Sequence, residues 1–127
     1  MRAAPCTPAE AARFLAPALG AKANPGGAAD MAELLRGSCF LVRDEAGRGV
    51  GAYVLRGQGG EVWVQAAAGR AGTDLAEVFD GMIEQHGAGF ESIAFRTYRR
   101  GLVEKAKRRG YMVVDQSDGY ILRKKLK

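Results

Sequence analysis

The chain contains few side chains that could hold a metal ion or a disulfide framework. Among its 127 residues there are two cysteines, Cys6 and Cys39, and a single histidine, His86. The two cysteines stand in unrelated sequence contexts, and this inventory excludes the common Cys/His zinc sites and a disulfide-stapled scaffold. A reducing cytoplasm is therefore the location that we expect.

Long apolar runs are also missing. No stretch approaches the roughly 20 apolar residues that span a bilayer, so we expect no membrane insertion. The opening residues MRAAPCTPAE lack the apolar region of a secretory signal. The composition is 47% hydrophobic and 26% charged, which is ordinary for a globular protein. The length suits one domain over residues 1–127.

Positive charge is concentrated in the last third of the chain. Residues 1–90 hold 8 Lys/Arg and 10 Asp/Glu, a net charge of −2, whereas residues 91–127 hold 11 and 4, a net charge of +7. This asymmetry indicates an anionic partner, either nucleic acid or a phosphate-bearing cofactor. A solvated basic face that serves solubility is the alternative.

Two helices are expected in the first part of the chain. Thr7 can cap a helix that has Pro8 at its first position, and Glu10 can complete a capping box. Pro17 would clash with the preceding turn, so the first helix should bend or end there. A second short helix is expected after Asp30, with Gly37 at its end.

The pattern then changes to strands. Residues 38–44 and 50–56 predict a β-hairpin, and 61–68 predict a third strand of the same antiparallel meander. The strand at 50–56 is apolar on both faces, so both faces of the sheet should be covered. Residues 72–87 form the clearest amphipathic helix, and residues 91–98 return to strand.

The basic stretch RRGLVEKAKRRGY predicts a helix in which Leu102, Val103 and Ala106 form one apolar side. Gly110 fits its C-terminal cap, and the last residues predict a hairpin around Asp118-Gly119. The order is therefore α-α-β-β-β-α-β-α-β-β. It indicates an α/β (α+β) domain with a mixed, mostly antiparallel central sheet flanked by helices.

This order resembles the GNAT superfamily of acyl-CoA-dependent N-acyltransferases. The strand EVWVQAAA enters the small-residue loop AGRAGT, which opens a helix. The strand SIAFRTY leads into a helix ending KRRGY, where the family often has Tyr-Glu-Lys-x-Gly-Phe, and a terminal hairpin follows. The likeness extends from Thr7 to Leu126, although the family's usual strand before the first helix is not expected here.

The resemblance implies acetyl-CoA as a cofactor. Its pyrophosphate would meet the amides of the loop at a helix start, a favourable place for an anion, and its pantetheine would pair with the backbone of the preceding strand. The family pattern has Gln or Arg where Ala66 stands. A tight strand-to-helix turn with no ligand is the alternative for this loop. The implied cofactor-binding residues are Val64, Gln65, Ala66, Gly69, Arg70, Ala71, Gly72, Thr73, Arg99 and Arg100.

The catalytic positions of the family are matched less well. Acetyl transfer to an amine needs a proton donor for the departing thiolate, and the family's Tyr for this role falls at Ala106. Tyr98 is the candidate substitute, whereas Tyr111 is expected in the core. Glu61 is the candidate base, with a solvated strand-end carboxylate as the alternative, and His86 fits a helix end better than a catalytic role.

Three functions follow as hypotheses. The first is a small N-acetyltransferase that uses acetyl-CoA on an unknown amine. The second is a GNAT-like module without transferase activity, which would bind CoA or a protein and would suit a bacterial or phage accessory protein. The third is non-specific nucleic-acid binding by the basic residues of 96–109 and the tail RKKLK. The edge of the last hairpin could also pair two copies into a homodimer.

Overall fold

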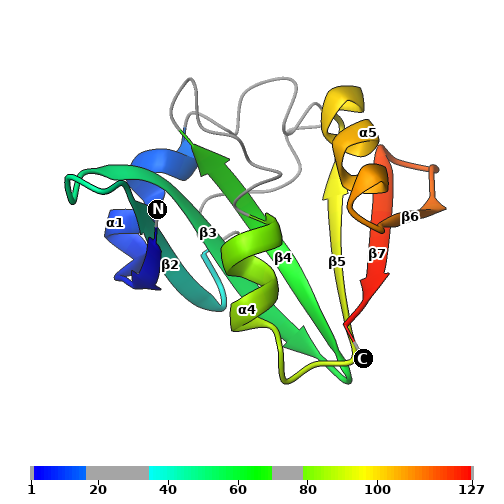
Figure 1. Cartoon of the computed structure of the whole chain (residues 1–127), viewed down its shortest axis with the longest axis horizontal. Helices are drawn as coiled ribbons and strands as arrows, with labels where there is room; N and C mark the ends of the chain where they lie inside the picture. Colours follow the sequence, from blue (N-terminus) through cyan, green and yellow to red (C-terminus); the bar gives the residue numbers. More distant parts are fainter. Residues whose placement is uncertain (1, 17–34, 70–78, 127) are drawn as a thin grey trace.

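Seven strands form one mixed sheet in the order β1-β2-β3-β4-β5-β7-β6, as Figure 1 shows. The computed structural model describes residues 2–16, 35–69 and 79–126. The strands are β1 Arg2–Pro5, β2 Ser38–Arg43, β3 Gly49–Gln58, β4 Glu61–Gly69, β5 Ser92–Thr97, β6 Met112–Asp115 and β7 Tyr120–Lys125. The helices are α1 Pro8–Leu15, the π-helical turn η2 Phe79–Ile83, α4 Glu84–His86 and α5 Arg100–Arg108.

A strand does precede the first helix, so the expectation of its absence was wrong. β1 runs antiparallel to β2, with Ala4 opposite Leu41 and Pro5 opposite Phe40. It is the outer strand of the sheet, a place where the missing N–H of a proline is tolerated. The element order over the described residues is therefore β-α-β-β-β-α-β-α-β-β. Most of the second expected helix lies outside these residues.

Helix α1 begins with the expected capping box. Thr7 Oγ1 accepts a hydrogen bond from the Glu10 amide at 3.2 Å, and Glu10 Oε1 accepts one from the Thr7 amide at 3.0 Å. The helix ends at Leu15, two residues before Pro17. The proline ring would clash with the preceding turn if the helix continued. Ala11 and Leu15 are fully buried against the sheet.

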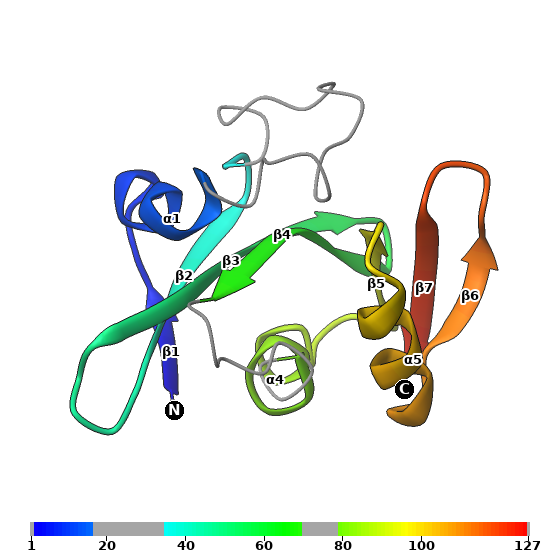
Figure 2. The ribbon, with the colours of Figure 1, turned by 90° about the horizontal axis from the view of Figure 1, so that it is seen from above.

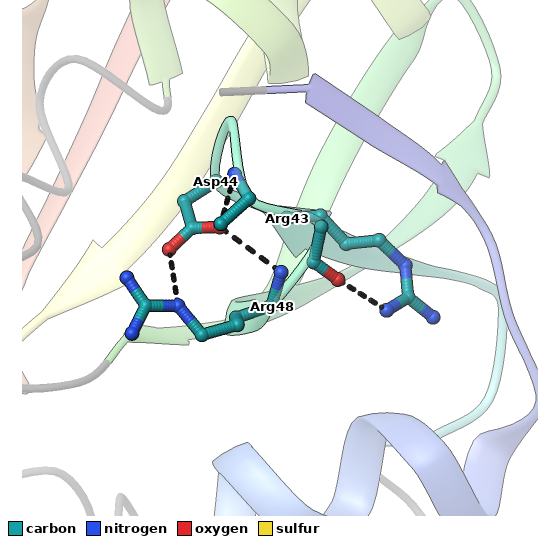
Figure 3. Close-up of polar contacts among 5 residues, drawn as sticks. Arg43, Asp44 and Arg48 are labelled. Carbon is teal, nitrogen blue, oxygen red and sulfur yellow. Dashed lines mark hydrogen bonds and ion pairs between the residues drawn. The ribbon is translucent and has the colours of Figure 1, made fainter.

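The turn between β2 and β3 is held by one aspartate (Figure 3). Asp44 Oδ1 accepts hydrogen bonds from the amides of Ala46 at 2.9 Å and Arg48 at 3.0 Å, and its second oxygen pairs with Arg48 Nε at 3.1 Å. These bonds lower the pKa of Asp44, the Arg48 amide contributing most. Arg43 donates from Nη1 to the Gly47 carbonyl at 3.0 Å. The expected hairpin is confirmed.

Both faces of the sheet are covered, as expected for an apolar central strand. Figure 2 shows α1 on one side and α4 and α5 on the other. The α1 side holds a small core of Ala11, Leu15, Cys39, Ala52 and Val54. The opposite side holds the main core, whose largest fully buried side chains are Tyr53, Ile83, Ile93, Leu122, Val42, Val62 and Val103.

The C-terminal part follows the sequence closely. α5 buries Val103 and Ala106. At its end the Tyr111 amide donates to the Ala106 carbonyl and the Gly110 amide to the Lys107 carbonyl, while Gly110 has φ of +97°. This is the bonding of a Schellman cap. Tyr111 is 4% exposed and packs in the core, as predicted.

Candidate functional site

The sheet opens between β4 and β5. These parallel strands are paired only from Glu61 with Ser92 to Val64 with Phe95. Beyond that point, β4 continues against β3 and β5 continues against β7. Figure 1 shows the two strands close together at their starts and apart at their arrowheads. The β5-facing edge of β4 after Val64 thus has no ladder partner in β5.

A β-bulge lies at the point where the strands part. Val54 of β3 is opposite Ala66, but the next residue, Leu55, is opposite Val64. Gln65 is therefore the extra residue of β4. A bulge bends its strand and increases the local twist, which accounts for the turning of β4 away from β5. Val64, Gln65 and Ala66, the residues expected to bind pantetheine, all stand at this bend.

The end of β5 carries the start of α5 to the same open end. Thr97 Oγ1 accepts a hydrogen bond from the Arg99 amide at 3.0 Å, which fixes the entry into the helix. Arg99 is the N-cap residue and makes no side-chain cap bond. Arg99 and Arg100 are exposed. Uncapped amides and two guanidinium groups are thus available for an anion beside the diverging strands.

The far end of β4 leads into the expected phosphate loop. Gly69, its last residue, lies opposite Gly51 of β3. A Cβ on Gly51 would stand 2.8 Å from the Ala68 carbonyl oxygen, so the backbones of the two strands approach closely here. Gly69 is the one residue of the expected loop that the structure describes; Arg70, Ala71, Gly72 and Thr73 lie outside the described residues.

Tyr98 lies at the open end, directly after β5. Its ring packs on the turn between β6 and β7. The contact is so close that a Cβ added to Gly119 would stand 2.7 Å from Tyr98 Cδ1. Burial, and then the nearby Asp118 carboxylate, raise the pKa of Tyr98. Its hydroxyl therefore stays protonated at neutral pH, the state that a proton donor needs.

Glu61 lies at the opposite, closed end of β4. Ser92 Oγ donates to Glu61 Oε2 at 2.8 Å and Arg123 Nη2 donates to Glu61 Oε1 at 3.1 Å. The Arg123 bond, and then the Ser92 bond, lower the pKa of Glu61. A carboxylate held in this way is a weak base, so the structure does not bring the two catalytic candidates together.

Ala106, at the position of the family's tyrosine, faces the core. It is 4% exposed and packs in the main core with Val103 and Tyr111. On α5, Ala106 therefore packs the helix against the main core.

Two polar clusters that had no signal in the sequence lie on the α4 side of the sheet. Tyr53 Oη and His86 Nδ1 are 2.5 Å apart, and the His86 ring stacks on Phe40 with centroids 4.3 Å apart. Glu84 of α4 binds Lys124 Nζ at 2.9 Å. These partners stand 33 and 40 positions apart in the chain, a separation that local patterns cannot bridge. No cluster of three or more potential metal ligands occurs within the described ranges.

No protein-family model and no curated protein matches the sequence of this chain. The structure, in contrast, matches an acetyltransferase of the GNAT family from Staphylococcus aureus with a TM-score of 0.69 and 11% identity, covering 99% of each chain. An aminoglycoside 6'-acetyltransferase type Ii matches with a TM-score of 0.70 and 12% identity, covering 100% of this chain and 98% of the other.

The chain has the GNAT fold. The predicted resemblance is confirmed at this level, since TM-scores of 0.69 and 0.70 over nearly whole chains show a shared fold. A third structural match is N-acetylglutamate synthase from Neisseria gonorrhoeae, solved with coenzyme A and N-acetyl-glutamate, with a TM-score of 0.60 and 13% identity. It covers 94% of this chain but 32% of that longer protein.

Proposed function

We propose that the chain is an N-acetyltransferase that uses acetyl-CoA, with residues 1–127 acting as one GNAT domain in the cytoplasm. The separation of β4 from β5 after Val64 and Phe95 carries this proposal. It leaves a stretch of β4 that is not paired with β5, beside a helix start and exposed arginines, a combination that suits a long ligand with an amide-bearing arm and phosphates. The fold-level match to acetyltransferases supports it.

The residues present fit such a cofactor. The backbone of Val64, Gln65 and Ala66 would pair with the pantetheine arm, and Arg99 and Arg100 at the start of α5 would bind phosphate. Residues Gly69 to Thr73 would supply the amides for the pyrophosphate. Acetyl-CoA supplies an acetyl group activated as a thioester. The chain would hold that group at the bend of β4.

Of the two catalytic candidates, Tyr98 is the better placed. It stands at the open end with its hydroxyl protonated, and it would give a proton to the departing thiolate. Glu61 would act as a base only if its carboxylate left Arg123, and its present contacts support a structural role at the closed end. The acceptor is an amine that must arrive neutral, or lose its proton to a group or water near the bend.

The decisive experiment is calorimetric titration of acetyl-CoA into the protein at moderate salt. Micromolar binding is expected, and Arg70→Ala should weaken it about tenfold by removing a charge-assisted contact to phosphate. Arg2→Ala is the matched control, because it removes the same charge from an exposed residue of β1 at the sheet's far edge. Absence of heat, or equal weakening by both variants, contradicts the proposal.

The burial of Ala106 favours one alternative, a GNAT module that binds CoA or a protein partner without catalysis. Thiol release from acetyl-CoA in the presence of a broad panel of amines separates the two functions. Binding with no thiol release above the rate without protein supports the module.

Nucleic-acid binding is less well supported by the geometry. Lys124 points to the α5 side of the sheet, where it pairs with Glu84 and lies over Tyr111, whereas Arg123 binds Glu61 on the opposite face. The basic tail is thus divided between two faces, because neighbouring strand residues point in opposite directions. Such a division does not favour one continuous basic footprint.

A homodimer is a further part of the proposal. β6 is the outer strand at the C-terminal edge of the sheet, and its Met112 and Val114 side chains are 70% and 47% exposed. Exposed apolar residues on an edge strand favour pairing with a second copy. Sedimentation at several concentrations tests this, and Met112→Lys should shift the protein toward monomer.

Among the described helices, none is long and apolar enough to cross a membrane.

A further inference from the structure

The two cysteines, 33 positions apart in the sequence, lie opposite each other in the fold. β1 and β2 pair up to Pro5 with Phe40, and the Cys6 amide donates to the Cys39 carbonyl at 3.0 Å, which continues the same register by one pair. Residues directly opposite in an antiparallel pair point to the same face. Cys6 accordingly packs against the small core under α1 to which Cys39 belongs.

This placement brings the two backbones within the Cα separation that a disulfide needs. In a hydrogen-bonded antiparallel pair the Cα atoms are about 5.5 Å apart, within the usual range of roughly 4.4–6.8 Å for disulfides. Both thiols are free in this structure. Cys39 Sγ points to the Leu35 carbonyl at 3.7 Å, a weak contact that a small rotation would release.

We propose that Cys6 and Cys39 form a redox-sensitive dithiol that low-molecular-weight disulfides, such as oxidised glutathione, convert to an intramolecular disulfide. The two thiols differ in access: Cys6 is partly exposed, whereas Cys39 is 6% exposed. Cys6 is therefore the attacking thiol and Cys39 the resolving one.

The exchange balances without a further oxidant. The Cys6 thiolate attacks one sulfur of oxidised glutathione, forming a mixed disulfide and releasing one glutathione thiolate. The Cys39 thiolate then attacks the Cys6 sulfur and releases the second glutathione. Two protein thiols are oxidised to one disulfide, and one glutathione disulfide is reduced to two thiols, which take up the two protons that the protein thiols lose.

The surroundings make this reaction slow at neutral pH. Burial, then Cys39 and Glu10 of α1, raise the pKa of Cys6, and the Ala11 backbone and then Arg43 of β2 lower it to a smaller extent. Burial also raises the pKa of Cys39. Because the thiolate is the attacking species, the rate should increase as the pH rises. The pair would thus respond to sustained oxidation.

The disulfide would change the N-terminal part of the chain. Cys6 directly precedes Thr7, the cap of α1, so the bond would fasten the start of that helix to β2. It would also close the loop between residues 6 and 39, which restricts the unfolded chain and should raise the midpoint of thermal unfolding by roughly 10 °C.

The test treats the reduced protein with oxidised glutathione at mildly alkaline pH and follows its intact mass and free thiols. The expected product is a monomer that has lost two hydrogens and both thiols and carries no glutathione. Peptide mapping without reduction should find Cys6 joined to Cys39, and a reductant should reverse the shift in thermal midpoint.

Two single variants test the order of attack. Cys39→Ser should retain one glutathione on Cys6, because no resolving thiol remains, whereas Cys6→Ser should stay largely unmodified while folded. If either variant fails to fold, the mapped peptides of the wild-type protein decide alone. Persistent glutathione on the wild-type protein, disulfide-linked dimers, or unchanged thiols at alkaline pH would each overturn the proposal.

Discussion

Arg123 of β7 binds Glu61 of β4 across the intervening strand β5. In the register of the sheet, Ala94 of β5 lies opposite both Trp63 and Arg123. The arginine side chain therefore passes diagonally across β5 to reach Glu61, which lies two residues before Trp63 on β4. Ser92 of β5 donates to the same carboxylate. Three strands are therefore joined by side chains at the closed end of the sheet, while β4 and β5 separate at the other end.

This contact predicts a pH-dependent stability. The pKa of Glu61 is lowered on folding, so its contribution is complete above the ordinary value of 4.5 and is lost as the pH falls through the lower folded value. The two side chains are 45% and 20% exposed, so Glu61→Gln should cost only about 0.5–1 kcal/mol at neutral pH. Urea unfolding across the acid range should show the wild type and the variant converging. A constant difference at all pH values contradicts the account.

Tyr98 offers a test of catalysis that rests on the proposed function. Tyr98→Phe should lower kcat by roughly 10²-fold through loss of proton donation and leave the affinity for acetyl-CoA unchanged. Gly119→Ala is a matched variant, because its Cβ would displace the Tyr98 ring without removing the hydroxyl. A partial loss of kcat is expected for it. Full activity of Tyr98→Phe in steady-state assays removes Tyr98 from the mechanism.

Ala106 tests whether the family's tyrosine can simply be restored. Since this residue is buried in the main core, Ala106→Tyr should overpack it and destabilise the protein by about 1–3 kcal/mol. No gain in turnover is expected. Thermal unfolding and the acetyl-transfer assay decide together, and a stable variant with increased turnover would show that position 106 reaches the reacting thioester.

The capping box of α1 gives a prediction that is independent of function. Thr7→Ala removes the acceptor of the Glu10 amide and should destabilise the protein by about 1 kcal/mol. Thr7→Ser keeps the hydroxyl and serves as its control, with little change expected. Denaturant unfolding measures both, and equal losses would show that the cap hydroxyl does not contribute.

Local patterns in the sequence predicted most elements of the fold. Thr7, Pro8 and Glu10 act within one turn of α1, and Gly110 acts at the end of α5, so short-range chemistry defines these boundaries. β1 was missed because four residues that include a proline carry no strand periodicity. They form a strand because the edge of β2 supplies hydrogen bonds to them.

The candidate site was predictable only in part. The divergence of β4 from β5 follows from a bulge at Gln65, which is defined by the register of β3 and has no signature in the letters EVWVQAAA. Glu61 and Arg123 are 62 positions apart, so their ion pair, which decides how basic Glu61 is, could not be inferred. The same holds for Cys6 and Cys39.

The short parallel ladder between β4 and β5 also has a consequence for folding kinetics. β2, β3 and β4 follow one another as neighbours in the chain, and so do β5, α5, β6 and β7, so each half of the sheet can form from contacts that are close in sequence. Non-local pairings are slow to form. The Val64–Phe95 ladder, together with the Glu61–Arg123 and Glu84–Lys124 pairs, should therefore form late and join two halves that are already ordered.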